Sequence, residues 1–151
     1  MPDGTPPDQL IPTKLADYLA VMSKAVFQTG MSWRVVEAKW AGTLEVFRDF
    51  DPQTLLELTP DDVDAIAIDT RITRNRRKVE ATIANAKRLL ELDEAHGTFQ
   101  NYLRSHADFD SLIKDLTKNF KFLGRMGAFY MLYVVGEEVP DHTAYMASTR
   151  K

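Results

Sequence analysis

The residues best suited to chemistry, by type and by spacing, form a cationic run between positions 71 and 78. The run consists of Arg71, Arg74, Arg76, Arg77 and Lys78. It lies where one expected helix ends and a longer one begins. A helix N-terminus offers free N–H groups and a positive field, and each guanidinium can bind two phosphate oxygens in a fork. The run therefore predicts a phosphate-binding surface. The alternative is a solvated basic face that Asp61, Asp62 and Asp64 offset.

A second candidate is the glycine-containing segment 119–127, which joins two expected helices. A short turn of this kind can present backbone N–H groups to one phosphate without reading the base sequence. The residues expected to contact DNA there are Lys121, Phe122, Gly124 and Arg125. The alternative is an ordinary helical corner in which Phe120 and Phe122 belong to the core.

A third candidate is the pair Asp141-His142, which follows Pro140. A carboxylate beside an imidazole can act as a general base or stabilise a developing positive charge, so Asp141 is the candidate catalytic residue. The alternative is a structural role for His142. The other two histidines, His96 and His106, lie far along the chain with no paired spacing, and we expect neither a metal nor a cofactor.

Aromatic residues form the fourth candidate. A base extruded from DNA is held between aromatic faces, although aromatic residues at helical spacing are more often plain core. Trp33 follows a Gly-Met-Ser turn and is the best candidate for a pocket wall. Phe27 and Tyr18 are expected beside it, whereas Trp40 is expected in the core.

Length and composition limit the classes of protein that are possible. The chain has 151 residues, which suits one domain, and a formal net charge of -3. Binding to nucleic acid must therefore rest on a local basic surface, because the whole chain is acidic. The absence of cysteine excludes disulfides and thiolate metal sites. No apolar run reaches the roughly 20 residues that span a bilayer, and we expect a cytoplasmic protein without a signal peptide or membrane contact.

The elements that must position these residues are helices. Thr59-Pro60 followed by two aspartates is a strong start signal for a helix, and Gly97 ends a long apolar stripe. Alternating strand patterns are absent. We predict an all-α, compact multi-helix domain over residues 13–142, with a flexible lead-in at 1–12 and a loose tail at 143–151.

Taken together, these pieces resemble the DNA-3-methyladenine glycosylase I family over about residues 20 to 142. The matching motifs are Gln28-Thr29-Gly30-Met31-Ser32-Trp33, Phe50-Asp51-Pro52, the basic junction from Asp61 to Lys78, Phe120-Lys121-Phe122-Leu123-Gly124, and Val139-Pro140-Asp141-His142. No single motif is decisive, but their order and spacing together are specific.

The resemblance implies a DNA glycosylase-like fold with a helix-hairpin-helix element at about residues 111–136. It implies a monomer that removes an alkylated purine, of the 3-methyladenine type, from double-stranded DNA in base excision repair. The flipped base would stack on Trp33. Because alkylation makes this base cationic and a good leaving group, the protein mainly has to flip it and stabilise the developing sugar cation, a role that Asp141 could fill.

The chain also departs from the family pattern. His142 matches one zinc ligand of the family, but Met146 stands where a cysteine is expected, so no zinc is predicted. The acidic residue that contacts the base in the family falls at Ala25. Glycines of the family's basic junction become Arg71 and Arg77. Two other hypotheses therefore stay open: a non-catalytic DNA-binding paralogue that has lost the base pocket, and a helical protein-interaction module.

Overall fold

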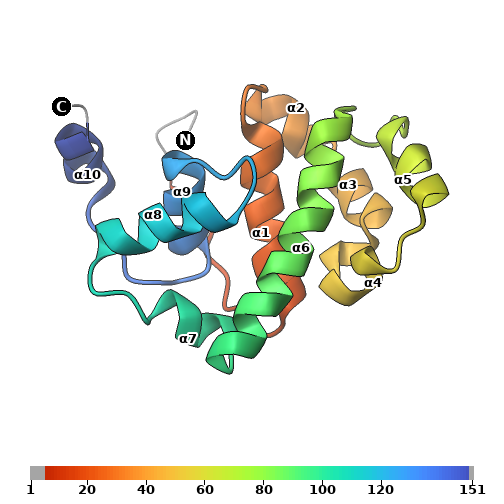
Figure 1. Cartoon of the computed structure of the whole chain (residues 1–151). Helices are drawn as coiled ribbons and strands as arrows, with labels where there is room; N and C mark the ends of the chain where they lie inside the picture. The colour runs from red at the N-terminus through yellow and green to blue at the C-terminus, as the bar shows by residue number, and fades with distance from the viewer. Residues whose placement is uncertain (1–5, 150–151) are drawn as a thin grey trace.

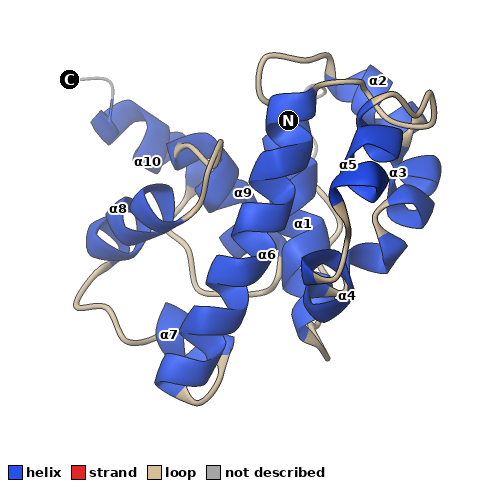
Figure 2. Cartoon of the chain, turned by 45° about the vertical axis from the view of Figure 1, so that its right-hand side comes forward, coloured by secondary structure: helices blue, strands red, loops and turns tan. Residues whose placement is uncertain are grey.

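The computed structural model describes residues 6–149 and contains only helices and connecting loops over that range (Figure 2). The helices in chain order are α1 (Leu15–Gln28), α2 (Trp33–Ala38), α3 (Trp40–Val46), the 3-10 helix η1 (Arg48–Phe50), α4 (Pro52–Leu56), α5 (Pro60–Ala67), α6 (Arg76–His96), α7 (Phe99–Leu103), α8 (Phe109–Asn119), α9 (Arg125–Val134) and α10 (His142–Thr149). The predicted all-α class is confirmed.

Helices α1 and α6 pack against each other at the centre of the molecule (Figure 1). Helices α2 to α5 lie on one side of this pair and α7 to α10 on the other. Leu19 and Met22 of α1 and Val79 and Leu89 of α6 are completely buried. Each such side chain contributes about 1.5–3 kcal/mol of hydrophobic stabilisation. The packing of this central pair therefore fixes where the end of α1 and the start of α6 lie, and the basic candidate residues stand at the start of α6.

Side-chain caps fix where the helices begin and end. Thr59 accepts a hydrogen bond from Asp62 N at 3.1 Å, and the Asp62 carboxylate accepts one from Thr59 N at 2.9 Å, which closes a capping box at α5. Asn75 caps α6 by accepting from Lys78 N at 3.2 Å. Gly97, with φ of 83°, ends α6 in a backbone conformation that glycine adopts easily. The start and stop signals read from the sequence are confirmed here.

The segments flanking the predicted domain are more ordered than expected. Leu10 N donates to Val134 O and the Gln9 side chain to Tyr133 O, each at 2.8 Å, so the lead-in is tied to α9. Residues 143–149 belong to α10, and the prediction of a loose tail is wrong for them. Tyr145 is buried, with its ring 5.3 Å from that of Phe109. Residues 1–5 and 150–151 of these two predictions lie outside the described range.

Across residues 6–149, no helix combines the length and the apolarity needed to cross a bilayer.

Candidate nucleic-acid interface and adjoining pocket

The basic junction, residues 71–78, divides into exposed and neutralised cations. Arg74 and Arg77 are exposed. Arg71 pairs with Asp69 at 2.7 Å and Glu45 at 3.2 Å, and its hydrogen bonds lower the pKa of Asp69 to about 2.

Arg76 is held in the same way by acidic neighbours. It pairs with Asp64 at 2.5 Å and lies 4.0 Å from Glu80. The alternative of an offset basic face thus has support at Arg71 and Arg76. The positive potential that is least compensated by such pairs comes from Arg74 and Arg77 at the start of α6.

Lys78 does not belong to this surface. Its side chain is 3% exposed, and Nζ donates to Phe27 O at 3.2 Å and to Thr29 O. The last carbonyls of a helix lack partners within it, and Lys78 supplies donors at this end of α1. Burial lowers the pKa of Lys78. The prediction that Lys78 contacts DNA is therefore wrong, because the first turn of α6 points this residue at α1.

The second candidate is the turn between α8 and α9, residues 120–124, called the hairpin below. Lys121, Phe122, Gly124 and the following Arg125 are exposed, whereas Phe120 and Leu123 are buried. The two alternatives read from the sequence thus divide by residue: Phe120 is core, and Phe122 is at the surface.

The hairpin is held in a defined shape. Phe122 has a φ of 59°, in the left-handed region that a bulky residue adopts only under constraint. The constraint comes in part from Asn85 of α6. This buried side chain accepts from Lys121 N at 2.8 Å and donates to Lys121 O at 3.1 Å.

The basic junction and the hairpin meet on one face. The guanidinium of Arg77 lies 5.8 Å from the centre of the Phe122 ring. The hydroxyl oxygen of Thr29, just after α1, lies 3.5 Å from Phe122 O, and its shorter hydrogen bond, at 3.2 Å, goes to Ala25 O. Two segments that lie more than forty residues apart in the sequence therefore present exposed cationic side chains on one face.

A cavity of about 300 Å³ adjoins this face, and we call it the Trp33 pocket. Its lining residues are Ala25, Gln28, Thr29, Met31, Trp33, Met126, Gly127, Phe129, Tyr130 and His142. The volume lies at the lower end of the range for small-molecule sites. Helices α1 and α9 approach closely at its floor, since a Cβ added at Gly127 would lie 3.3 Å from that of Ala25.

Of the residues predicted to bind a base, the structure places Trp33 in the pocket but not Phe27 or Tyr18. Phe27 is 1% exposed and packs on Phe47, with ring centres 5.7 Å apart. Tyr18 is buried edge-on against Phe99 at 5.0 Å. Both predictions are wrong, because these residues lie on faces of α1 that point into the core. The face of α1 that points toward α9 carries Ala25 and Gln28, and these two residues line the pocket instead. Trp33 belongs to α2, so its place in the sequence does not indicate which residues of α1 it faces.

Asp141 is not among the residues that line the pocket, but the next residue in the sequence is. Asp141 is exposed, and its carboxylate accepts from Ala144 N at 2.9 Å, which caps α10. The following residue, His142, lines the pocket and its ring lies 5.2 Å from that of Phe129. A zinc ion does not fit here: within residues 6–149 no three His, Cys, Asp or Glu side chains come together as a ligand set.

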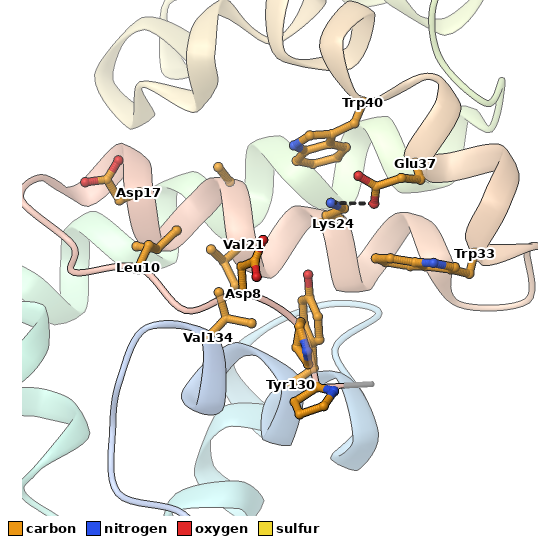
Figure 3. Close-up of a pocket in the computed structure, with 13 residues that line it drawn as sticks. Asp8, Leu10, Asp17, Val21, Lys24, Trp33, Glu37, Trp40, Tyr130 and Val134 are labelled. Carbon is orange, nitrogen blue, oxygen red and sulfur yellow. Dashed lines mark ion pairs between the residues drawn. The ribbon is translucent and has the colours of Figure 1, made fainter. Parts of the chain in front are cut away.

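A second cavity of about 430 Å³ lies across the wall that Trp33 and Tyr130 form, since these two residues line both cavities (Figure 3). The Lys24 ammonium pairs with Glu37 at 2.7 Å and lies 5.1 Å from the centre of Trp33 and 5.4 Å from that of Trp40.

Two of the residues that line this second cavity are Tyr130 and Trp40. Burial, followed by the charge of Glu37, raises the pKa of Tyr130 to about 12. Trp40, expected in the core, is half-buried: it stacks on Phe50 with ring centres 5.5 Å apart and also lines this cavity.

Comparison with known proteins places the chain in a family. Residues 16–123 match the family model described as methyladenine glycosylase. The DNA-3-methyladenine glycosylase of Haemophilus influenzae is 30% identical over 89 residues, which cover 59% of this chain and only 48% of that protein. The chain thus aligns with about half the length of this relative. DNA-3-methyladenine glycosylase 1 of Escherichia coli is 28% identical over 136 residues, covering 76% of this chain and 72% of that one.

Solved structures agree. A crystal structure of a variant of 3-methyladenine DNA glycosylase I in complex with 3-methyladenine is 25% identical, with a TM-score of 0.72 over 84% of this chain and 80% of that chain. A mutant of the Staphylococcus aureus 3-methyladenine DNA glycosylase I gives a TM-score of 0.68 at 25% identity, over 86% of this chain and 80% of that one. The fold, the order of the motifs and the family match lead to one conclusion: this chain belongs to the methyladenine glycosylase family.

Proposed function

We propose that this protein is a DNA glycosylase that removes alkylated purines, of the 3-methyladenine type, from double-stranded DNA in base excision repair. One observation supports the proposal most strongly: the Trp33 pocket is joined to the hairpin. Thr29 lines the pocket, and its hydroxyl oxygen lies 3.5 Å from the carbonyl oxygen of Phe122. A base that rotates out of a duplex bound at the hairpin would therefore have a cavity beside it, and Thr29 lies between that cavity and the hairpin.

The proposed DNA contacts use the exposed half of the candidate residues. α8, the hairpin and α9 would act as a helix-hairpin-helix element, with the free N–H groups at the start of α9 directed at a phosphate. Lys121 and Arg125 would flank this contact. Arg74 and Arg77 at the start of α6 would hold a neighbouring stretch of the same backbone. The ion-paired Arg71 and Arg76 would contribute less, since acidic neighbours already compensate them.

The proposed chemistry is hydrolysis of the N-glycosidic bond. The base would rotate out of the duplex and stack on Trp33. The bond to the cationic base breaks as the base leaves, now neutral, with the electron pair. Water then adds its hydroxyl group to the sugar carbon and releases its other proton to the solvent. Positive charge develops on the sugar between these events. Asp141 is the proposed stabiliser of that charge, which would require its carboxylate to turn from the cap of α10 toward the sugar.

All proposed site residues lie on one chain, so the proposed reaction needs no second copy of the protein, and we expect a monomer. We also expect that it uses no cofactor and that it acts in the cytoplasm. Sedimentation of the free protein and of its DNA complex tests the stoichiometry. A complex of two protein chains on one damaged duplex would contradict it.

The decisive assay is release of free base from alkylated duplex DNA by purified protein, with the Escherichia coli relative assayed alongside. We expect release by the wild type, a strong loss in Trp33→Ala, and a loss in Asp141→Asn without weaker binding to undamaged duplex. If the relative releases base and this protein does not, the enzymatic proposal fails. Salt-sensitive binding without release would then identify a DNA-binding protein.

A further inference from the structure

The helix that carries Trp33 is weakly anchored by its own residues. α2 has six residues, all of them described, and Val36 is the one that is buried. Ser32, at the start of this helix, gives it no side-chain cap. A helix this short is unstable on its own in water, so its place depends on contacts with the rest of the molecule. The direction of the Trp33 indole therefore depends on what ties α2 to α1.

Lys24 and Glu37 form such a tie. The Lys24 ammonium on α1 pairs with the Glu37 carboxylate on α2 at 2.7 Å. Glu37 follows Trp33 by four positions, so the two side chains leave the same face of α2. The Lys24 side chain is only 16% exposed, and a partly buried pair is screened less by salt than a pair at the open surface. The ion pair thus joins α1 to α2 on the face that carries Trp33.

The Lys24 ammonium also contacts the indole rings. Nζ lies 5.1 Å from the centre of Trp33 and 5.4 Å from that of Trp40, distances at which a cation is attracted to the face of an indole. Figure 3 shows the ion pair between the two indoles, with the Tyr130 hydroxyl directed at it. Trp40 has a second support, because it stacks on Phe50. Within residues 6–149 no ring stacks on Trp33 in this way, so Lys24 is its main restraint.

The ion pair restrains the ring without adding net charge. A lysine alone behind Trp33 would repel a cationic base stacked on the side of the Trp33 pocket. The Glu37 carboxylate, 2.7 Å from the Lys24 ammonium, compensates that charge. A cation can therefore hold the indole from one side while a cationic base stacks on it from the other.

We propose that the Lys24–Glu37 ion pair positions Trp33 for the reaction: it fixes α2 and holds the indole in the orientation on which the flipped base stacks. This role rests on the proposed function and adds two positioning residues to it. Neither residue lines the Trp33 pocket, so both act through Trp33 and not by touching the base. A ring that is already held in place loses less freedom when the base stacks on it, which favours the flipped state.

The first test measures single-turnover release from a duplex that contains a cationic N-methylated purine, with protein in excess. Lys24→Met keeps an apolar chain but removes the charge, and it should lower the rate constant roughly tenfold, the equivalent of about 1.4 kcal/mol. Repulsion between like charges alone predicts the opposite, a faster release once the ammonium is gone. Lys24→Arg keeps both the ion pair and the cation–π contact and should stay within about threefold of the wild type.

A double-variant cycle tests whether the two residues act as one unit. Glu37→Gln breaks the ion pair but leaves the ammonium between the indoles, so a smaller loss of about threefold is expected. The protein with both Lys24→Met and Glu37→Gln should be no slower than Lys24→Met alone, because the second substitution has no pair left to break. Losses that multiply would show that the residues act separately and would overturn the role of the pair.

Arg104→Met is the matched control for charge and stability. Arg104 pairs with Glu137 at 3.1 Å, one partner of this pair is largely buried, and Arg104 lines neither cavity beside Trp33. This variant removes one positive charge and one ion pair, as Lys24→Met does, and should release base at the rate of the wild type. Both variants should bind undamaged duplex as the wild type does. An equal loss of release in the two variants would show a general structural effect and overturn the proposal.

Nuclear magnetic resonance relaxation reports the positioning without catalysis. Trp33 and Trp40 are the two tryptophans of the chain, and Trp33→Phe and Trp40→Phe assign their indole N–H signals. In Lys24→Met the order parameter of the Trp33 indole should fall, while that of Trp40, which stacks on Phe50, should not change.

The failure of the positioning role and that of the proposed function give different results. If the wild type releases base, an unchanged Trp33 order parameter in Lys24→Met, or a release rate at or above that of the wild type, overturns the positioning role and leaves the proposed function standing. If the wild type releases no base, the proposed function fails. The order parameter then still decides whether the ion pair holds Trp33, and an unchanged value overturns that as well.

Discussion

Asn85 holds Lys121 by both of its backbone groups, accepting from the N–H at 2.8 Å and donating to the carbonyl at 3.1 Å. Asn85 is 1% exposed and lies on α6, whose first turn carries Arg77. One buried amide thus joins the two halves of the proposed DNA surface. The hairpin is positioned by the long central helix as well as by its own flanking helices.

Substitution of Asn85 should loosen the hairpin without unfolding the domain. Asn85→Ala leaves a buried N–H and a buried carbonyl unpaired, at about 1–3 kcal/mol each when water does not reach them. We expect faster hydrogen exchange at Lys121 N and duplex affinity lower by roughly tenfold, the equivalent of about 1.4 kcal/mol. Asn101→Ala, which removes an exposed side-chain bond to His96 O, is the control. Unchanged protection at Lys121 would show that Asn85 does not set the hairpin.

The exposed cations should determine the salt dependence of DNA binding. Each phosphate contact that is lost lowers the slope of log affinity against log salt by about 0.9. We expect Arg77→Gln and Lys121→Gln each to lower the slope by about one unit. Lys14→Gln, which lies at the opposite end of α1 from Thr29, should leave it unchanged. Equal slopes in all three variants would place the duplex on another face.

Lys78 should affect stability instead of DNA binding. Lys78→Met removes the donor to Phe27 O and Thr29 O and should lower the free energy of unfolding by about 1–3 kcal/mol at neutral pH. The salt slope of duplex binding should not change. A lower slope in this variant would return Lys78 to the DNA surface.

The pH dependence of Lys78 has a definite sign. Burial lowers its pKa in the folded state below the ordinary 10.5. Between those two pKa values the unfolded chain binds more protons than the folded one, so this residue's contribution to stability rises with pH in that alkaline window. Urea unfolding of the wild type and of Lys78→Met at pH 8 and pH 10.5 measures it. A free energy of unfolding that falls for the wild type relative to Lys78→Met between pH 8 and pH 10.5 would contradict the assignment.

The sequence predicts local structure here better than the direction in which side chains point. Capping at Thr59 and termination at Gly97 depend on neighbouring residues, and both are found. Lys78 belongs to a cationic run, but helical rotation turns it inward while Arg77 stays outside. Phe27 is adjacent to Gln28 in sequence, yet only Gln28 lines the pocket. These differences arise from packing of α1 against α6 and α9, which a pattern along one helix does not contain.

The C-terminal tail shows the same limit of sequence patterns, because here the sequence predicts less structure than is present. Helix α10 has no apolar stripe, so periodicity does not predict it. Tyr145 nevertheless anchors it in a cluster with Phe109 and Phe129, with ring centres 5.3 and 5.2 Å away. Contacts between residues separated by more than fifteen positions decide its conformation, and short-range sequence patterns do not contain such contacts.

Asp115 links α7 to α8 and should make the stability of this half of the molecule sensitive to acid. Its carboxylate accepts from Tyr102 OH at 2.6 Å and lies 2.9 Å from Nε2 of His106. Burial raises the pKa of Asp115, but hydrogen bonds from Tyr102 and His106 outweigh burial, so the net pKa lies below the ordinary 3.8. A carboxyl group with a depressed folded pKa stabilises the protein above its unfolded pKa, and this contribution is lost as the pH falls through the folded value.

Asp115→Asn should therefore lower the free energy of unfolding at pH 7, and the gap to the wild type should shrink as the pH falls below 3.8. The side chain is 38% exposed, and solvent screening limits the loss to about 1 kcal/mol. Urea unfolding at pH 7 and pH 3 measures both values. Asp110→Asn, at an exposed position of the same helix, should show little loss at either pH. A gap as large at pH 3 as at pH 7 would mean that Asp115 acts through packing and not through its charge.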